Sequence, residues 1–212
     1  MEYILTIRIP LPLKVKKVIS REKKRLVTKY GSGYESEPHI TLYLGRYSKS
    51  GFSRLVEYIE TVSIKSFNIS LLNPGVTMSK NRSTKFFFLD VSSKKQIHDL
   101  HTRVLKAVAL YRGSLLRRKD QNRVRQGLFS KKEVSNLNKY GYARVLKLFS
   151  PHITLGEVGT DRAGPKLSDL RKNLASIKGV NFPVDRIVLM LYEKESEKIK
   201  ARLLEKSVLK LG

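Results

Sequence analysis

The stretch Pro38-His39-Ile40-Thr41-Leu42 recurs letter for letter as Pro151-His152-Ile153-Thr154-Leu155 in the second half of the chain. Because the surroundings of the two copies also match in pattern, we interpret the repeat as an internal duplication. In a β-strand, residues i and i+2 point to the same face, so each copy presents a His and a Thr together while its Ile and Leu face the core. The repeat therefore predicts two strands that bring two imidazoles and two hydroxyls to one wall of a shared cleft.

The segments around the two copies predict the same order of elements. In the first half, alternation at residues 3–9 predicts a strand, and helical spacing follows over residues 14–30. After the first copy we expect a helix from about residue 52 and a strand at 66–72. In the second half we expect a strand at 86–91, a helix over 97–108, a short helix beyond residue 165, and strands at 187–192 and 201–209. This order predicts two similar α+β lobes around a pseudo-two-fold axis.

We expect one bilobal domain over residues 1–212, with lobes at about 1–72 and 85–212 and a turn-rich crossover at 73–84. The expected fold class is α+β, with two antiparallel sheets lining a central cleft and helices outside. A basic insertion at 112–150 breaks the symmetry. A segment of this length without clear periodicity is usually functional or mobile, and a disordered insertion is the alternative.

The charge balance favours phosphate-bearing partners. The 212 residues include 43 Lys and Arg against 18 Asp and Glu, which gives a formal net charge of +25. Such a field attracts polyanions, so nucleic acid is the first candidate. A small anionic metabolite is also compatible, and basic composition that serves only solubility is the third reading.

Several protein classes are disfavoured by the composition. The chain has no Cys, which excludes disulfides, thiolate metal sites and cysteine nucleophiles. Its apolar runs are far shorter than the roughly 20 residues that cross a bilayer, so we expect no membrane segment. Residues 1–9 lack the features of a secretion signal. We therefore expect a cytoplasmic protein.

Two histidines near neutral pH suit phosphodiester chemistry, because one can remove a proton from the attacking oxygen while the other protonates the leaving oxygen. Hydroxyls of Thr41 and Thr154 can hold the non-bridging phosphate oxygens. For a single copy, a histidine in the core would be the simpler reading. The duplication favours function, because packing alone does not demand the same polar pair in two diverged halves. The motif strands supply no Asp, Glu or Cys, so no metal or cofactor is expected.

The other two histidines lie three residues apart on the expected helix over 97–108. We interpret His98 and His101 as surface or interlobe residues. No further zinc ligands are evident beside them in the sequence, which disfavours a metal site there.

The doubled motif, Pro38-His39-Ile40-Thr41-Leu42 and Pro151-His152-Ile153-Thr154-Leu155, resembles that of the two-histidine (2H) phosphoesterase superfamily. Members have a bilobal, pseudo-symmetric α+β fold and include RNA 2′,3′-cyclic phosphodiesterases, also called 2′-5′ RNA ligases. The resemblance implies that His39 and His152 form the acid–base pair and that Thr41 and Thr154 hold the phosphate. Which histidine is the acid stays open at this point.

The leading hypothesis is a metal-independent phosphodiesterase that acts on RNA 2′,3′-cyclic phosphate ends, giving a 2′-phosphate, or on 2′-5′ linkages. We expect the protein to be a monomer. We also expect basic side chains of the insertion to hold the backbone of the RNA substrate, with a tyrosine stacking on a terminal base. These candidates are Arg117, Arg118, Arg123, Arg125, Tyr140 and Tyr142. The alternatives are a phosphodiesterase of a small cyclic phosphate or nucleotide, and a non-catalytic RNA-binding module.

Overall fold

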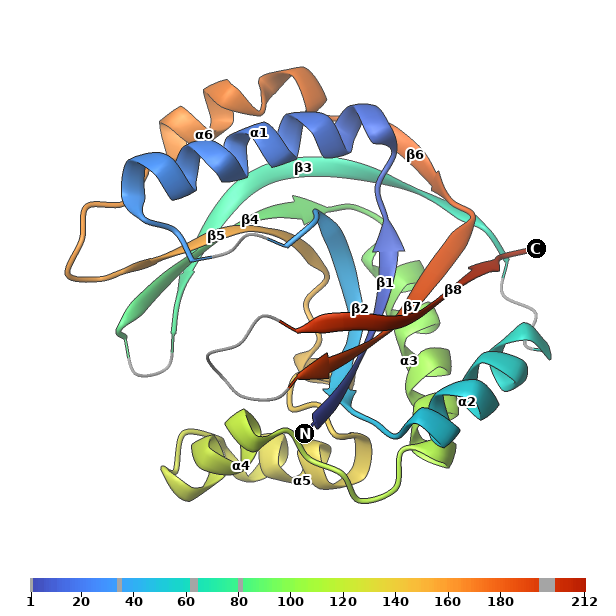
Figure 1. The fold of residues 1–212 in the computed structure, drawn as a ribbon. Helices are drawn as coiled ribbons and strands as arrows, with labels where there is room; N and C mark the ends of the chain where they lie inside the picture. Colours follow the sequence, from blue (N-terminus) through green and yellow to red (C-terminus); the bar gives the residue numbers. More distant parts are fainter. Residues whose placement is uncertain (1, 34–35, 62–64, 80–81, 195–200) are drawn as a thin grey trace.

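The computed structural model describes residues 2–33, 36–61, 65–79, 82–194 and 201–212 (Figure 1). Its strands are β1 (Glu2–Pro10), β2 (His39–Arg46), β3 (Phe67–Met78), β4 (Thr84–Val91), β5 (His152–Gly159), β6 (Asn181–Val184), β7 (Arg186–Lys194) and β8 (Arg202–Lys210). Its α-helices are α1 (Leu13–Tyr30), α2 (Lys49–Thr61), α3 (Lys94–Tyr111), α4 (Arg118–Arg125), α5 (Lys131–Tyr140) and α6 (Leu167–Asn173). Short 3-10 turns follow at Leu146–Leu148 and Ala175–Ile177. The α+β prediction is confirmed.

The strands form one antiparallel sheet in the order β6-β3-β4-β5-β2-β1-β7-β8. Its two halves meet at the motif strands β2 and β5, which share the single register pair Ile40 and Ile153. The sheet prediction therefore differs from the structure, since two expected sheets are joined into one through the duplicated motif. The central cleft stays a prediction.

The two halves of the sheet are not the two halves of the sequence. β7 and β8 lie beside β1 and so belong with the first motif strand, while β3 lies in the half that contains the second. The lobe bounds at 1–72 and 85–212 stay a prediction. β7 pairs antiparallel with β1, so the end of the chain lies beside its beginning. β1 and β7 are the two central strands of the four-stranded half β2-β1-β7-β8, and their many buried apolar side chains suit that position.

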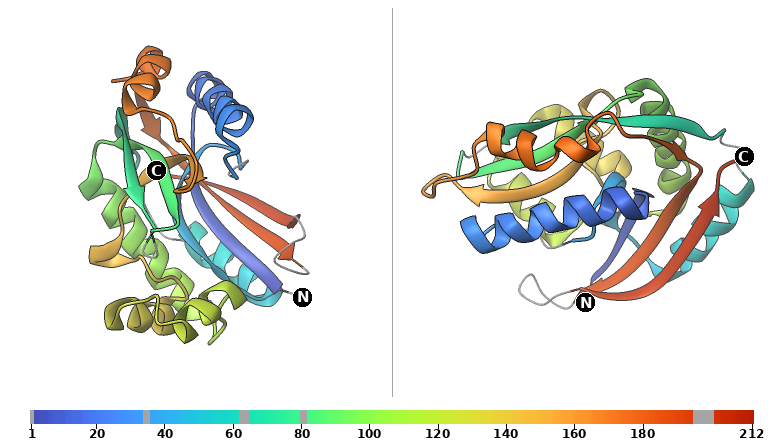
Figure 2. Two further views of the ribbon diagram at one scale, coloured as in Figure 1. Left: turned by 90° about the vertical axis from the view of Figure 1, so that its left-hand side faces the viewer. Right: turned by 90° about the horizontal axis from the view of Figure 1, so that it is seen from above.

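The helices bind the halves together in a reciprocal way. α1 follows β1 yet packs against β5, whereas α3 follows β4 yet packs against β2. The strand, helix and motif-strand order thus occurs twice, and each helix covers the other half's motif strand (Figure 2). α2 lies against β7 and β8, and α6 lies against β3. This exchange is the structural form of the duplication that the repeat predicted.

The expected crossover at 73–84 is instead the end of β3 and its turn into β4, although residues 80 and 81 lie outside the described residues. Pro74 and Gly75 sit at a register shift in the β3–β4 ladder, where a strand tolerates both residue types. A Cβ on Gly75 would lie 2.6 Å from the ring of Phe88. The glycine therefore makes room for that ring, which the turn signal alone did not reveal.

Candidate active site

The motif residues gather where the two halves of the sheet meet. Ile40 and Ile153 form the register pair between the two motif strands. Both isoleucines are fully buried, and so are Leu42 and Leu155, so the apolar residues of both motifs face the core as expected. In an antiparallel pair, one step to either side of the central isoleucines sets each motif's His opposite the other motif's Thr. Four side chains therefore share the opposite face, which we call the motif face: His39, Thr41, His152 and Thr154.

The register of the flanking strands extends these positions into two rows across the sheet. In one row, Arg8 on β1 lies opposite Thr41, and Asp90 on β4 lies opposite His152. Residues paired across strands point to the same face, so a guanidinium and a carboxylate flank the motif on opposite sides. The motif is symmetric, but its surroundings are not.

The second row has different neighbours. Pro10 lies opposite His39, and Phe88 lies opposite Thr154. The ring of Phe88 also contacts His152 edge-on, with 5.6 Å between the ring centroids. An aromatic ring thus lies on the β4 side of the motif, next to Asp90, while the β1 side carries the cation.

His39 is oriented by its own strand. Its Nδ1 lies 2.6 Å from the carbonyl oxygen of Glu37, and its Nε2 lies 3.0 Å from Oγ1 of Thr41. A carbonyl only accepts, so Nδ1 carries a proton and donates it. In the neutral imidazole Nε2 then accepts from the Thr41 hydroxyl. The lone pair of Nε2 is therefore the group available for a proton from substrate.

His152 is held in the equivalent way. Its Nδ1 lies 2.7 Å from the carbonyl oxygen of Ser150, which is again the residue two positions earlier. The same reasoning leaves Nε2 for the substrate. The two histidines occupy diagonal corners of the motif face, where side chains of an antiparallel pair lie roughly 7–8 Å apart. A phosphate group between them would present its attacking and leaving oxygens to different imidazoles.

The charges around the two histidines differ. Burial, with help from the positive charge of Arg8 and Lys23, lowers the pKa of His39 to about 4, although its bond to the Glu37 carbonyl opposes this. Burial also lowers the pKa of His152, with a contribution from Arg144, but the carboxylate of Asp90 acts in the opposite direction. The neutral form is thus favoured more strongly at His39.

His101 links β2 to the segment that precedes β5 from within the core, which corrects the surface interpretation and fits an interlobe one. It is fully buried on α3, and its ring stacks on Phe149 at 3.8 Å. Its Nδ1–H donates to the carbonyl oxygen of Leu42, while Nε2 accepts from the backbone N–H of Leu146. Leu42 follows Thr41 directly, and Phe149 lies two positions before Pro151, the first residue of the second motif. One imidazole therefore ties the two motif segments together.

The insertion at 112–150 is folded into α4, α5 and a 3-10 turn. Arg117 forms an ion pair with Asp120 at 2.6 Å, and its side chain is largely buried. The backbone N–H of Arg118 donates to the carboxylate of Glu2 at the start of β1. Glu2 lies six residues from Arg8, or about 20 Å along the strand. The basic helix α4 therefore begins at the far end of β1 from the motif.

The remaining predicted substrate contacts fall into two groups. Arg123 and Arg125 lie on α4, where Arg125 is exposed. Tyr140 and Tyr142 are half-buried and pack against the core, and Tyr142 contacts Tyr43 edge-on. The structure brings the four motif residues together and places these side chains with the insertion, so contacts with RNA through them stay a prediction.

Several charged side chains near the motif were not identified from the sequence, among them Arg8, Asp90 and Arg144. Arg8 had a usable signal, because Thr6 and Arg8 form the polar side of an otherwise apolar alternating strand. Asp90 is the last residue but one of β4, and Arg144 lies seven positions before Pro151 of the second motif. Their proximity to the histidines depends on strand register and loop geometry, which the motif itself does not encode.

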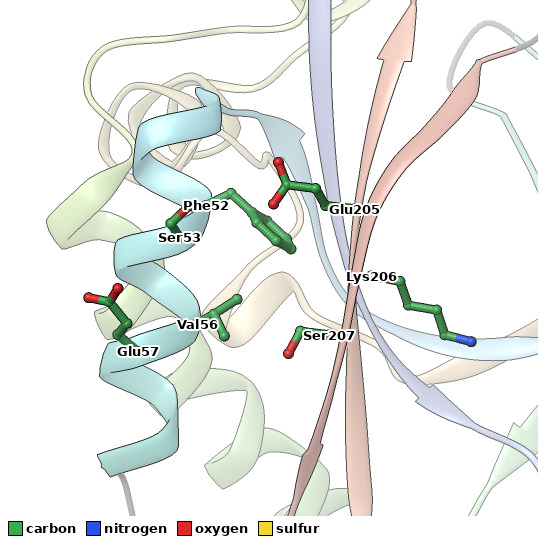
Figure 3. A pocket seen from close by; sticks show the side chains of 7 residues that line it. All are labelled: Phe52, Ser53, Val56, Glu57, Glu205, Lys206 and Ser207. Carbon is green, nitrogen blue, oxygen red and sulfur yellow. The ribbon is translucent and has the colours of Figure 1, made fainter.

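Outside the motif face, the features of interest in the described chain are metal-binding clusters, pockets and membrane helices. No set of three or more His, Asp or Glu side chains among the described residues is arranged to hold a metal ion. A surface pocket of about 530 Å³ lies between α2 and β8, away from the motif residues (Figure 3). No helix in the described ranges is long and apolar enough to cross a membrane.

The family model of the 2′-5′ RNA ligase superfamily matches residues 16–196. The chain belongs to this superfamily. The match confirms the resemblance to two-histidine phosphoesterases on which the doubled motif was interpreted. A comparison with curated protein sequences gives no match.

Solved structures share the fold of this 2′-5′ RNA ligase superfamily chain. TT0787 of Thermus thermophilus is similar with a TM-score of 0.58 at 17% identity, over 99% of this chain and 98% of that one. E. coli LigT complexed with phosphate has a TM-score of 0.56, and LigT complexed with 3′-AMP has 0.54, both at 14% identity over 98% of each chain. At these identities the likeness shows the fold alone.

Proposed function

We propose that the chain is a metal-independent phosphodiesterase that opens RNA 2′,3′-cyclic phosphate ends to a 2′-phosphate. The observation that carries the proposal is the motif face, on which two histidines and two threonines alternate at the corners of one square. Each histidine has Nδ1 fixed by a carbonyl and Nε2 left for substrate. Family membership supports phosphoester chemistry, and the +25 charge supports an RNA substrate.

The reaction follows from this arrangement. Thr41 and Thr154 donate hydrogen bonds to the non-bridging oxygens, which releases Nε2 of His39 from the Thr41 hydroxyl. That nitrogen takes a proton from water as the water oxygen bonds to phosphorus. The bond from phosphorus to the 3′ oxygen breaks on the opposite side, and Nε2–H of His152 protonates the leaving oxygen. The product carries a 2′-phosphate and a 3′-hydroxyl.

We assign the roles of the two histidines from the charges around them. His39, whose pKa is lowered by burial and then by the charge of Arg8, is the more strongly held in its neutral form and acts as the base. His152, which faces the carboxylate of Asp90, is the better placed to carry a proton and acts as the acid. A bound phosphate adds negative charge and favours protonation further. The reverse reaction, 2′-5′ ligation, uses the same groups with exchanged roles.

The direct test is an end-group assay. Purified protein with EDTA present should convert a short RNA that ends in a 2′,3′-cyclic phosphate to an RNA with a 2′-phosphate end. Chromatography that separates 2′- from 3′-phosphate ends measures the outcome. Absence of turnover with RNA binding retained would favour the non-catalytic alternative, and turnover of mononucleotides alone would favour the small cyclic phosphate.

A second prediction concerns pH. Asp90→Asn removes the negative charge that raises the pKa of His152 but keeps an oxygen for the Val91 backbone N–H. The pKa of the proposed acid then falls, so the basic limb of the profile of kcat/KM against pH should move to lower pH. Asp99→Asn is the matched control, because Asp99 pairs with Lys95 on the exposed side of α3. Equal profiles for the wild type and Asp90→Asn would contradict the assignment of His152 as the acid.

A further inference from the structure

Thr6 and Arg8 extend the motif face along β1. They are two residues apart on one strand, so their side chains point to the same face. Arg8 lies opposite Thr41, which fixes that face as the motif face. Thr6 lies opposite Met190 on β7, and Met190 lies opposite Lys206 on β8. The hydroxyl of Thr6 and the guanidinium of Arg8 thus occupy neighbouring positions beside the catalytic motif, and Lys206 lies in the row of Thr6, one strand beyond Met190.

Two of these groups hold buried polar atoms without a hydrogen-bond partner. Within the described part of the chain, Oγ1 of Thr6 and Nε of Arg8 are both buried and unpaired. A buried polar atom left unsatisfied in this way costs roughly 1–3 kcal/mol. Two such atoms on consecutive positions of one face, next to a binding site, indicate a ligand group that satisfies them.

The guanidinium of Arg8 reaches toward β7, although its charge still acts on His39. It lies 5.5 Å from the centre of the Tyr192 ring, and Tyr192 is paired with Ile4, four residues before Arg8 on β1. The side chain therefore leans toward Thr6 and the start of β1, whereas the scissile phosphate belongs between His39 and His152. Its ligand is thus a separate group from the one that reacts.

The positive charges around Thr6 and Arg8 favour an anionic ligand. Figure 3 shows Glu205 and Ser207 pointing toward α2 and Lys206 pointing to the other side of β8. The charges of Arg8 and Lys206 both lower the pKa of Glu37, after the larger contribution of Lys16. The carboxylate of Glu37 is already bonded to Lys16 at 2.6 Å. Among the described residues, no carboxylate forms an ion pair with Arg8.

We infer that Thr6 and Arg8, with Lys206 nearby, bind a second phosphate of the substrate: the 5′-phosphate of the nucleotide that carries the cyclic phosphate. In RNA this group is the phosphodiester to the preceding nucleotide. The inference rests on the proposed function and narrows it to oligonucleotide ends. Beyond this site, β1 leads about 20 Å to Glu2 and the basic helix α4, so a longer RNA would follow one strand from the motif to Arg118.

The test compares two ligands that differ only in the second phosphate. Calorimetry should show that the wild type binds adenosine 2′,5′-bisphosphate about 10-fold or more tightly than adenosine 2′-monophosphate, as expected for a charge-assisted contact. Arg8→Gln should bring this ratio close to one, and Thr6→Val should lower it by a smaller factor. The effect of Arg8 on His39 is common to both ligands and cancels in the ratio.

Arg171→Gln, an exposed position on α6, is the matched control for the loss of one positive charge and should keep the wild-type ratio. Equal affinities in the wild type, or a ratio that survives Arg8→Gln, would overturn the second phosphate site. Turnover of adenosine 2′,3′-cyclic phosphate with and without a 5′-phosphate tests the proposed function separately. A protein that prefers the bisphosphate but opens neither ring would lose the proposed function and keep the site.

Discussion

Replacing His39 with Ala should lower kcat for opening a 2′,3′-cyclic phosphate by about 10²- to 10⁴-fold, the usual contribution of one general base. The physical reason is that no other neutral imidazole on the motif face can take the proton from water, because His152 lies at the opposite corner and protonates the leaving oxygen. Single-turnover kinetics with the RNA substrate measures the chemical step directly. The variant should also lose the acidic limb of its pH profile, because the group that must be unprotonated is gone.

His152→Ala should cause a loss of similar size but should remove the basic limb instead. The double variant should be little worse than either single one, because the two histidines act in the same step. His98→Ala is the matched control, since His98 lies on α3 and touches Phe149 edge-on outside the motif face. A rate for either motif variant within a factor of about three of the wild type would refute two-histidine catalysis.

The repeated motif predicted much of the local structure. Its period of two placed the isoleucines and leucines in the core, and the structure buries all four fully. The helical spacing over 14–30 and 97–108 is found as α1 and α3. These predictions succeeded because they depend on local periodicity, which the alternation of apolar and polar residues sets within one element.

The pairing of distant strands was not predictable in the same way. The continuous apolar run at 187–192 fits a position beside either motif strand equally well, and only the packed structure pairs β7 with β1. β6 is four residues long and was missed because so short a segment carries little periodicity. The insertion lacked a clear apolar stripe, yet α5 is capped by a full capping box at Ser130 and Glu133.

In the candidate site, too, the residues set by local periodicity were predictable and those placed by strand pairing were not. The four motif residues are read from the repeat, and the structure brings them to one face. Arg8 and Asp90 join them only through strand register, which a motif search does not follow. His101 had a signal in its helical spacing, since it lies four residues after Ile97 and three before Val104 on the apolar stripe of α3. A histidine on such a stripe indicates a buried polar anchor.

His101→Ala should reduce the free energy of unfolding by about 3–5 kcal/mol, as large-to-small changes of buried rings do. The variant loses the stacking on Phe149 and leaves the Leu42 carbonyl and the Leu146 N–H unsatisfied in the core. Leu146 has a positive φ of 55°, an unfavourable conformation for a leucine, so the lost bond should also free this segment to relax. Urea denaturation at pH 7 measures the change.

The pH dependence of the free energy of unfolding tests whether His101 stabilises the fold as a buried neutral imidazole. Burial lowers the pKa of folded His101 to about 4, whereas an unfolded histidine titrates near 6.5. Between these values the unfolded chain binds more protons, so the free energy of unfolding falls as the pH is lowered from about 6.5 to 4. His101→Phe should retain the stacking on Phe149, lose both hydrogen bonds, and reduce this dependence by the share of one proton. A variant with the slope of the wild type would show that His101 is not a buried neutral imidazole joining β2 to the segment before β5.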